Sequence, residues 1–145
     1  MIFFCKEVIL VLKGEAMDNI TKEIFKKRIE EAKKNENELF LITFDILLSY
    51  LNEAIYEKSI DALRNADNCL DKIIEISNYN KLPIEVFVFC KQRFVKNICK
   101  EEFIDLKEIY AMIEKFKNAY NIKLNKDDKD YKYVIYNKRG DIKGY

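Results

Sequence analysis

Residues 39–51, LFLITFDILLSYL, carry apolar side chains on both sides of a predicted helix, around a single charge at Asp45. A helix turns about 100° per residue, so apolar positions separate into stripes along it. The first stripe consists of Leu41, Phe44, Leu48, Leu51 and Ile55. The second, on the opposite side, consists of Leu39, Ile42, Ile46 and Tyr50. An ordinary surface helix has only one such stripe. The protein's own helices or a partner must therefore cover the second.

Composition limits the classes of function. The chain has 145 residues and a net charge of only +1, from 26 basic and 25 acidic residues. It therefore lacks the strong positive charge typical of nucleic-acid-binding proteins. The absence of histidine removes the commonest general base and metal ligand, and the four cysteines form no Cys-x-x-Cys pair. We expect one domain in a reducing cytoplasm, with no catalytic residue, cofactor or metal, no nucleic-acid partner and no membrane insertion.

We expect residues 1–16 to lie upstream of the natural chain. Their apolar run is interrupted by Lys6 and Glu7 and has no basic stretch before it, unlike a signal peptide. Residues 13–16, Lys-Gly-Glu-Ala, back-translate readily to a purine-rich ribosome-binding sequence before an ATG for Met17. The predicted organisation is an upstream extension over 1–16, a helical domain over 17–124 and a tail over 125–145. The alternative is a short, poorly packed N-terminal extension.

The helical domain contains no glycine, and only Pro83 interrupts it, which predicts an all-α fold. Apolar residues recur at spacings of three and four in four long segments, which cover about residues 35–58, 59–77, 83–98 and 100–124. A shorter helix is predicted over about 19–34. Expected N-terminal caps are Asp18 or Asn19, Asn35 and Ser59, and residues 77–80 are expected to form a turn. Short connections favour an antiparallel up-down four-helix bundle with an extra short N-terminal helix.

The tail combines charged and aromatic residues. Residues 125–130 form a charged linker, and residues 131–136, Tyr-Lys-Tyr-Val-Ile-Tyr, alternate well enough for a strand. A lone hairpin is marginally stable in water. We therefore expect the tail to be disordered, docked on the bundle, or paired with something else.

Residues 38–45, Glu-Leu-Phe-Leu-Ile-Thr-Phe-Asp, resemble the first long helix of the flagellar secretion chaperone FliS family. That helix opens with Glu-Leu, an apolar run, an aromatic residue and an aspartate. Tyr50-Leu51 and Ala54 stand at later positions of the same pattern. The resemblance covers about residues 35–120, and Tyr120 stands where the family commonly has tryptophan. It implies a cytoplasmic helical chaperone that binds the C-terminal segment of flagellin, prevents early polymerisation and passes its client to the export apparatus, with the export gate as a second partner.

Helix-in-groove binding of such a client requires long apolar grooves. The first candidate groove floor consists of Leu39, Ile42, Ile46 and Tyr50. The second consists of Val88, Val95 and Cys99. The alternative is a five-helix packing in which both sets are internal and the N-terminal helix covers one of them. Cys69 and Cys90 occupy core positions, and Asp45 is expected to cap a neighbouring helix or pair with a Lys or Arg.

The sequence is also compatible with two other functions. The family's tyrosine-containing N-terminal segment is not evident before Asn35, which favours a diverged paralogue with a different exported client. The other is a small regulatory or toxin-neutralising protein that forms a homodimer through the second stripe of the central helix. We expect the chaperone itself to be a monomer or a weak homodimer.

Overall fold

The computed structural model describes residues 8–9, 11–13, 17–32, 35–79, 82 and 84–124, and every element in this part of the chain is helical. The elements are a short 3-10 helix η1 (Val11–Lys13) and the α-helices α2 (Asn19–Ala32), α3 (Glu36–Glu57), α4 (Ile60–Tyr79), α5 (Glu85–Lys100) and α6 (Leu106–Leu124). The expected all-α class is confirmed. The predicted tail over 125–145 and the predicted helix-starting Pro83 lie outside the described residues.

Three predicted helix caps are present. The Asp18 carboxylate accepts a hydrogen bond from the Thr21 backbone N–H at 2.8 Å, at the start of α2. Asn35 Oδ1 accepts one from the backbone N–H of residue 38 at 3.1 Å, and Ser59 Oγ accepts one from that of residue 62 at 3.0 Å. Each side chain satisfies a backbone donor that has no partner within the first helical turn. Local sequence therefore sets where these helices begin.

Two predicted helix ends are wrong. Ser77 and Asn78 lie inside α4 rather than in a turn, and Ser77 is fully buried. The last helix begins at residue 106 rather than near 100. Glu101 and Asp105 adopt left-handed backbone conformations, with φ of 53° and 63°, which separate α5 from α6. Asn97 holds this connection, because its side chain donates to the Ile104 carbonyl and accepts from the Ile104 N–H, both at 3.0 Å.

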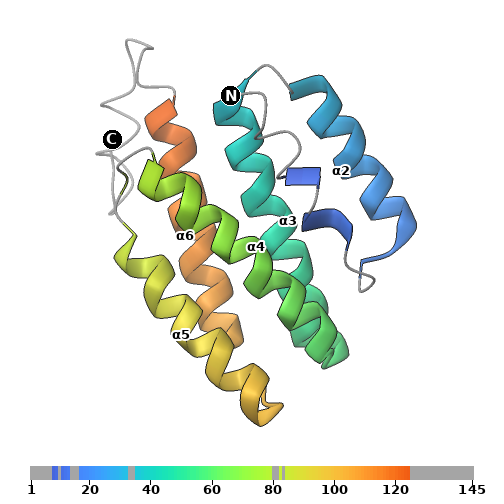
Figure 1. Ribbon diagram of the computed structural model, residues 1–145, viewed down its shortest axis with the longest axis vertical. Helices are drawn as coiled ribbons and strands as arrows, with labels where there is room; N and C mark the ends of the chain where they lie inside the picture. Colours follow the sequence, from blue (N-terminus) through green and yellow to red (C-terminus); the bar gives the residue numbers. More distant parts are fainter. Residues whose placement is uncertain are drawn as a thin grey trace.

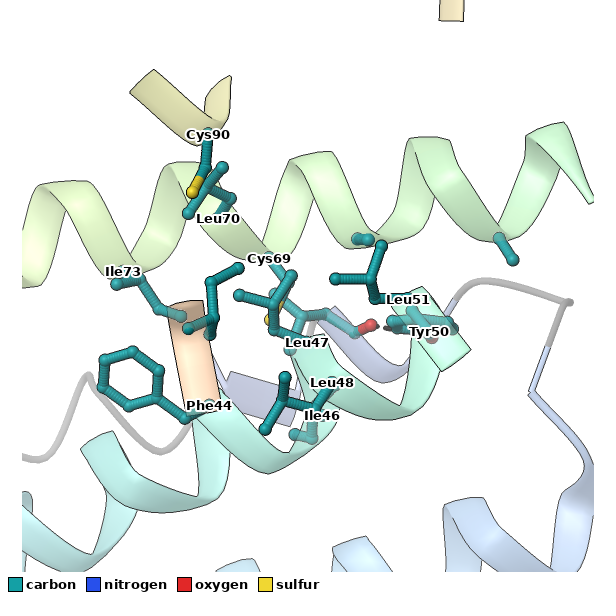
Figure 2. Close-up of a cluster of buried hydrophobic side chains, with 14 of the residues drawn as sticks. Phe44, Ile46, Leu47, Leu48, Tyr50, Leu51, Cys69, Leu70, Ile73 and Cys90 are labelled. Atoms are coloured by element: carbon teal, nitrogen blue, oxygen red, sulfur yellow. Dashed lines mark hydrogen bonds between the residues drawn. The ribbon is translucent and has the colours of Figure 1, made fainter. Parts of the chain in front are cut away.

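The helix α3 is the centre of the fold, because α2, α4 and α6 all pack on it. Figure 1 shows α3, α4, α5 and α6 running alternately in opposite directions, with α2 beside α3 on the side away from α5. Both predicted stripes of α3 are buried. Figure 2 shows Leu47 of α3 in the space between α3 and α4, and Leu70 of α4 beside Cys90 of α5. The helix α5 packs mainly on α4 and lies at the edge of the molecule.

An aromatic cluster joins α5 and α6 to the central helix. The ring of Phe44 lies between those of Phe40, Phe87 and Phe116, at centroid separations of 5.0, 5.8 and 5.9 Å. Phe87 and Phe116 themselves meet edge to face at 4.6 Å. Tyr120 packs edge to face on Phe40 at 4.8 Å. Edge-to-face contact is a preferred aromatic geometry, and each such pair adds about 0.5–1.5 kcal/mol beyond the area it buries.

The helix α3 is also long and apolar enough to span a membrane by length and composition, and no other helix in the described part of the chain meets both conditions. Its most apolar window is 72% buried within the structure. The central helix of a globular core has the same length and composition, so this feature follows from the burial of both stripes.

The burial of both stripes gives a direct test. Ile46 is fully buried, so Ile46→Ala should lower the free energy of unfolding by about 2–5 kcal/mol, through lost apolar contact and a residual cavity. The matched control is Ile20→Ala, because Ile20 is 76% exposed on α2, and it should change stability by about 0.5 kcal/mol or less. Urea denaturation of both variants measures the difference. Equal stabilities would contradict the burial of this stripe.

Candidate functional site

The first candidate groove floor is closed in this structure. Leu39, Ile46 and Tyr50 have no exposed surface, and Ile42 is 2% exposed. The cover on this side includes α2, which packs on α3 and contributes Phe25 to the same core cluster. The prediction of an open groove here is therefore wrong for this conformation. On this side of α3, the structure instead agrees with the alternative, in which these residues are internal and the N-terminal helix contributes to their cover.

The N-terminal segment is part of that cover. The Tyr50 hydroxyl donates a hydrogen bond to the Val11 carbonyl at 2.9 Å, inside the core. Val8, Val11 and Leu12 are buried in the same cluster. The description of this segment as poorly packed is therefore wrong for these residues. A natural start at Met17 remains a prediction, and a chain that starts there would lack the acceptor of the Tyr50 hydroxyl.

The two sides of α3 carry covers of different size. On one side, α4 contributes a continuous buried row: Ala62, Leu63, Ala66, Cys69, Leu70, Ile73 and Ile76. The helix α2 buries only Phe25 and Ile29, and the N-terminal segment adds Val8, Val11, Leu12 and Met17 to the core. The outer positions Ile20 and Ile24 of α2 are 76% and 55% exposed. Because buried apolar area sets the strength of such packing, α2 is the more weakly held of the two covers.

The second candidate set lies at the surface. Val88 and Val95 are 38% and 42% exposed, and Cys99 is also exposed, all on the outer side of α5. Val86 and Phe89, which were not predicted to belong to this surface, are 36% and 40% exposed on the same helix. Helical spacing could have found Phe89, because it falls opposite the core positions of α5. The outer side of α5 is therefore more apolar than predicted.

Asp45 joins three helices. Its Oδ2 accepts a hydrogen bond from Arg28 Nη2 of α2 at 2.7 Å, and its Oδ1 accepts one from Lys117 Nζ of α6 at 2.5 Å. The predicted pairing of Asp45 with a Lys or Arg is confirmed. Arg28 also lies over the Phe25 ring, 5.5 Å from its centroid. The carboxylate therefore anchors both flanking helices to the polar side of α3.

A second charged group fastens α5 to α4. Lys91 Nζ lies 2.7 Å from Asp67 Oδ2 and 2.9 Å from Asp71 Oδ1. Burial raises the pKa of Asp67, and the hydrogen bond from Lys91 offsets only part of this effect. Burial by itself would lower the pKa of Lys91, but its hydrogen bonds with Asp67 and Asp71 outweigh that effect and raise it. The group sets the rotation of α5, and with it the residues that face outward.

The acidic and thiol side chains of the described residues are dispersed, and two of the thiols are buried. No three Cys, Asp or Glu side chains among them are grouped so that they could hold a metal ion. Burial raises the pKa of the Cys69 thiol far above its usual range and that of Cys90 to about 11, so both remain protonated at neutral pH. A small pocket beside Arg93 and Lys96 at the end of α5 includes Asn97, whose amide already holds the α5–α6 connection. The notable surfaces are therefore apolar ones suited to binding.

No protein-family model matches this chain, and no curated protein or solved structure matches it. The resemblance to FliS thus rests on the residue pattern over about 35–120.

The Asp45 anchor predicts a stability effect. Asp45→Ala removes two charged hydrogen bonds and leaves Arg28 and Lys117 without this partner, so the free energy of unfolding should fall by about 1–2 kcal/mol at this partly exposed site. The control is Glu75→Ala, which removes one end of an exposed pair with Lys72 and should cost about 0.5 kcal/mol or less. Thermal and urea unfolding would measure both. A loss no larger than the control's would show that the anchor contributes little.

Thiol accessibility gives a second test of this geometry. In a Cys5→Ser background, Cys99 should react with an aromatic disulfide reagent in the native protein, because its thiol is exposed. Cys69 and Cys90 should react only after unfolding, because both are buried and hold raised pKa values. Peptide mapping by mass spectrometry identifies the labelled thiol. Native labelling of Cys90 as fast as that of Cys99 would contradict the packing of α5 on α4.

Proposed function

We propose that this protein is a cytoplasmic chaperone of the flagellar export type, which binds the C-terminal segment of flagellin, prevents its early polymerisation and presents it for export. In this proposal α3 to α6 form an antiparallel up-down four-helix bundle, and α2 is an additional helix on its side. The observation that carries the proposal is the pair of buried apolar stripes on α3, together with the packing of α2 on this helix through only two buried residues.

The size of this apolar surface suits the proposed client. The helix α3 has 22 residues, so it is about 33 Å long, enough for many turns of a partner helix. A flagellin end that is amphipathic and disordered before assembly folds on such a surface with its apolar side inward. The same surface would suit an amphipathic segment of another exported subunit. The choice of flagellin comes from the resemblance of residues 38–45 to the FliS pattern.

In the proposed complex, the client helix takes the place of part of the N-terminal cover and contacts Leu39, Ile42, Ile46 and Tyr50. Opening this side breaks the hydrogen bond between the Tyr50 hydroxyl and the Val11 carbonyl. The apparent affinity for the client is therefore reduced by the rarity of the open state. A change that weakens the cover without altering the apolar surface should strengthen client binding.

Calorimetric titration tests this proposal. The full chain should bind a peptide of the C-terminal segment of flagellin from the same organism as a 1:1 complex. Tyr50→Phe keeps the ring but removes the bond to Val11, so it should lower the apparent dissociation constant several-fold. Tyr56→Phe on the same helix is the control, because Tyr56 is 66% exposed, and it should leave binding unchanged.

Two results would count against the proposal in different ways. No binding by a well-folded chain would exclude flagellin as the client, and C-terminal segments of other exported subunits would then be the next probes. Flagellin binding that is unchanged or weakened in Tyr50→Phe would exclude displacement of the N-terminal cover as the route to the site.

A further inference from the structure

The outer side of α5 carries a second stripe, which we call the outer seam. Its members are Glu85, Val88, Phe89, Gln92, Val95 and Lys96. They follow the spacing of three and four residues that places side chains on one side of a helix. The core positions Phe87, Cys90 and Phe94 lie on the opposite side. The helix α5 is therefore patterned for contact on two sides, although only one of them is packed within the chain.

The seam is a fixed apolar surface. Val88, Phe89 and Val95 are 38%, 40% and 42% exposed within about two turns of helix. The inner side of α5 is held by Lys91 on α4 and by the contact of Phe87 with α6, so the outer residues cannot turn inward. Apolar side chains that gather on one exposed side of a helix mark an interaction surface.

The residues of the outer seam are arranged so that the seam can pack against the same seam of a second, antiparallel copy of α5. Gln92 lies at its centre, with Phe89 and Val95 three residues away on either side and Val88 and Lys96 four residues away. Two copies of α5 that pack antiparallel about a two-fold axis at Gln92 place Val88 against the partner's Val95, and Phe89 against the partner's Lys96. Each contact occurs twice, as in every two-fold interface.

The distribution of charged residues along α5 also favours antiparallel packing of the two copies. Glu85 stands at one end of the helix, and Lys96 and Lys100 stand near the other, all exposed. The antiparallel arrangement brings Glu85 beside the partner's Lys100, which gives two opposite-charge contacts. A parallel arrangement would instead set like charges against each other. We propose that the outer seam of α5 binds a second copy of this chain in an antiparallel two-fold dimer.

The size of the seam limits the strength of this dimer. The helix α5 has 16 residues and is thus about 24 Å long, with a contacting side about 10 Å wide. This footprint is well below the roughly 800 Å² per partner that stable complexes bury. The dimer should therefore be reversible, with a dissociation constant in the micromolar range or weaker. The seam lies on the side of the fold away from α2, so the dimer is independent of the proposed client site.

Exchange of the charges at Glu85 and Lys100 tests the predicted contact between the two copies of α5. Analytical ultracentrifugation of the full chain alone, from low-micromolar to submillimolar concentration, should show a monomer–dimer equilibrium. Glu85→Lys and Lys100→Glu should each raise the dissociation constant about tenfold, and the double variant should restore it. Both side chains are exposed, so circular dichroism should show unchanged folding. A monomer at every concentration, or single variants that dimerise like the parent, would overturn the proposal whatever the result with flagellin.

Cross-linking tests the direction of the two helices. In a chain with Cys5→Ser and Cys99→Ser, Gln92→Cys should form an intermolecular disulfide on mild oxidation, because the axis places the two copies of residue 92 side by side. With Gln92 retained and only Cys5→Ser, Cys99 should not cross-link, because the antiparallel arrangement separates the two copies by about 20 Å. Cross-linking through Cys99 rather than through residue 92 would overturn the antiparallel arrangement.

Discussion

The fold depends on the need to bury α3 on both of its apolar stripes. Leu39 and Ile46 of one stripe are as fully buried as Phe44 and Leu51 of the other. A single layer of helices can cover only one side of such a helix, so the chain supplies a second. The helix α4 makes the most extensive contact with α3, and α6 and α2 with the N-terminal segment complete its cover.

Charged side chains fix the helices that apolar contact alone would leave free to rotate. Asp45 is the one ionised group in the middle of α3, and it receives Arg28 from α2 and Lys117 from α6. Lys91 has the matching role between α4 and α5. Ion pairs of this kind contribute modest stability, but they specify which side of each helix turns inward. They thereby decide which apolar side chains remain outside.

The two surfaces proposed for binding have different physical origins. The side of α3 that holds Ile46 and Tyr50 is apolar because it belongs to the core, and its suitability for a client comes from the limited extent of its cover. The outer seam of α5 is exposed because no element in the described part of the chain packs on it. Val88 is therefore available without rearrangement, whereas Arg93 lies over the Phe89 ring, 5.0 Å from its centroid. A protein with both surfaces can hold a client and a second copy at the same time.

The sequence by itself determined the helical class, a first cap at Asp18 or Asn19, the caps at Asn35 and Ser59, and the presence of two stripes on α3, because these depend on spacing and local hydrogen bonds. It could not determine that the second stripe is also internal, because the periodicity of a helix is the same whether its cover belongs to the chain or to a partner. It also missed the break between α5 and α6, because the left-handed residues there are Glu101 and Asp105 rather than glycine. Only the tertiary structure decided these points, because burial depends on contacts between segments far apart in the chain.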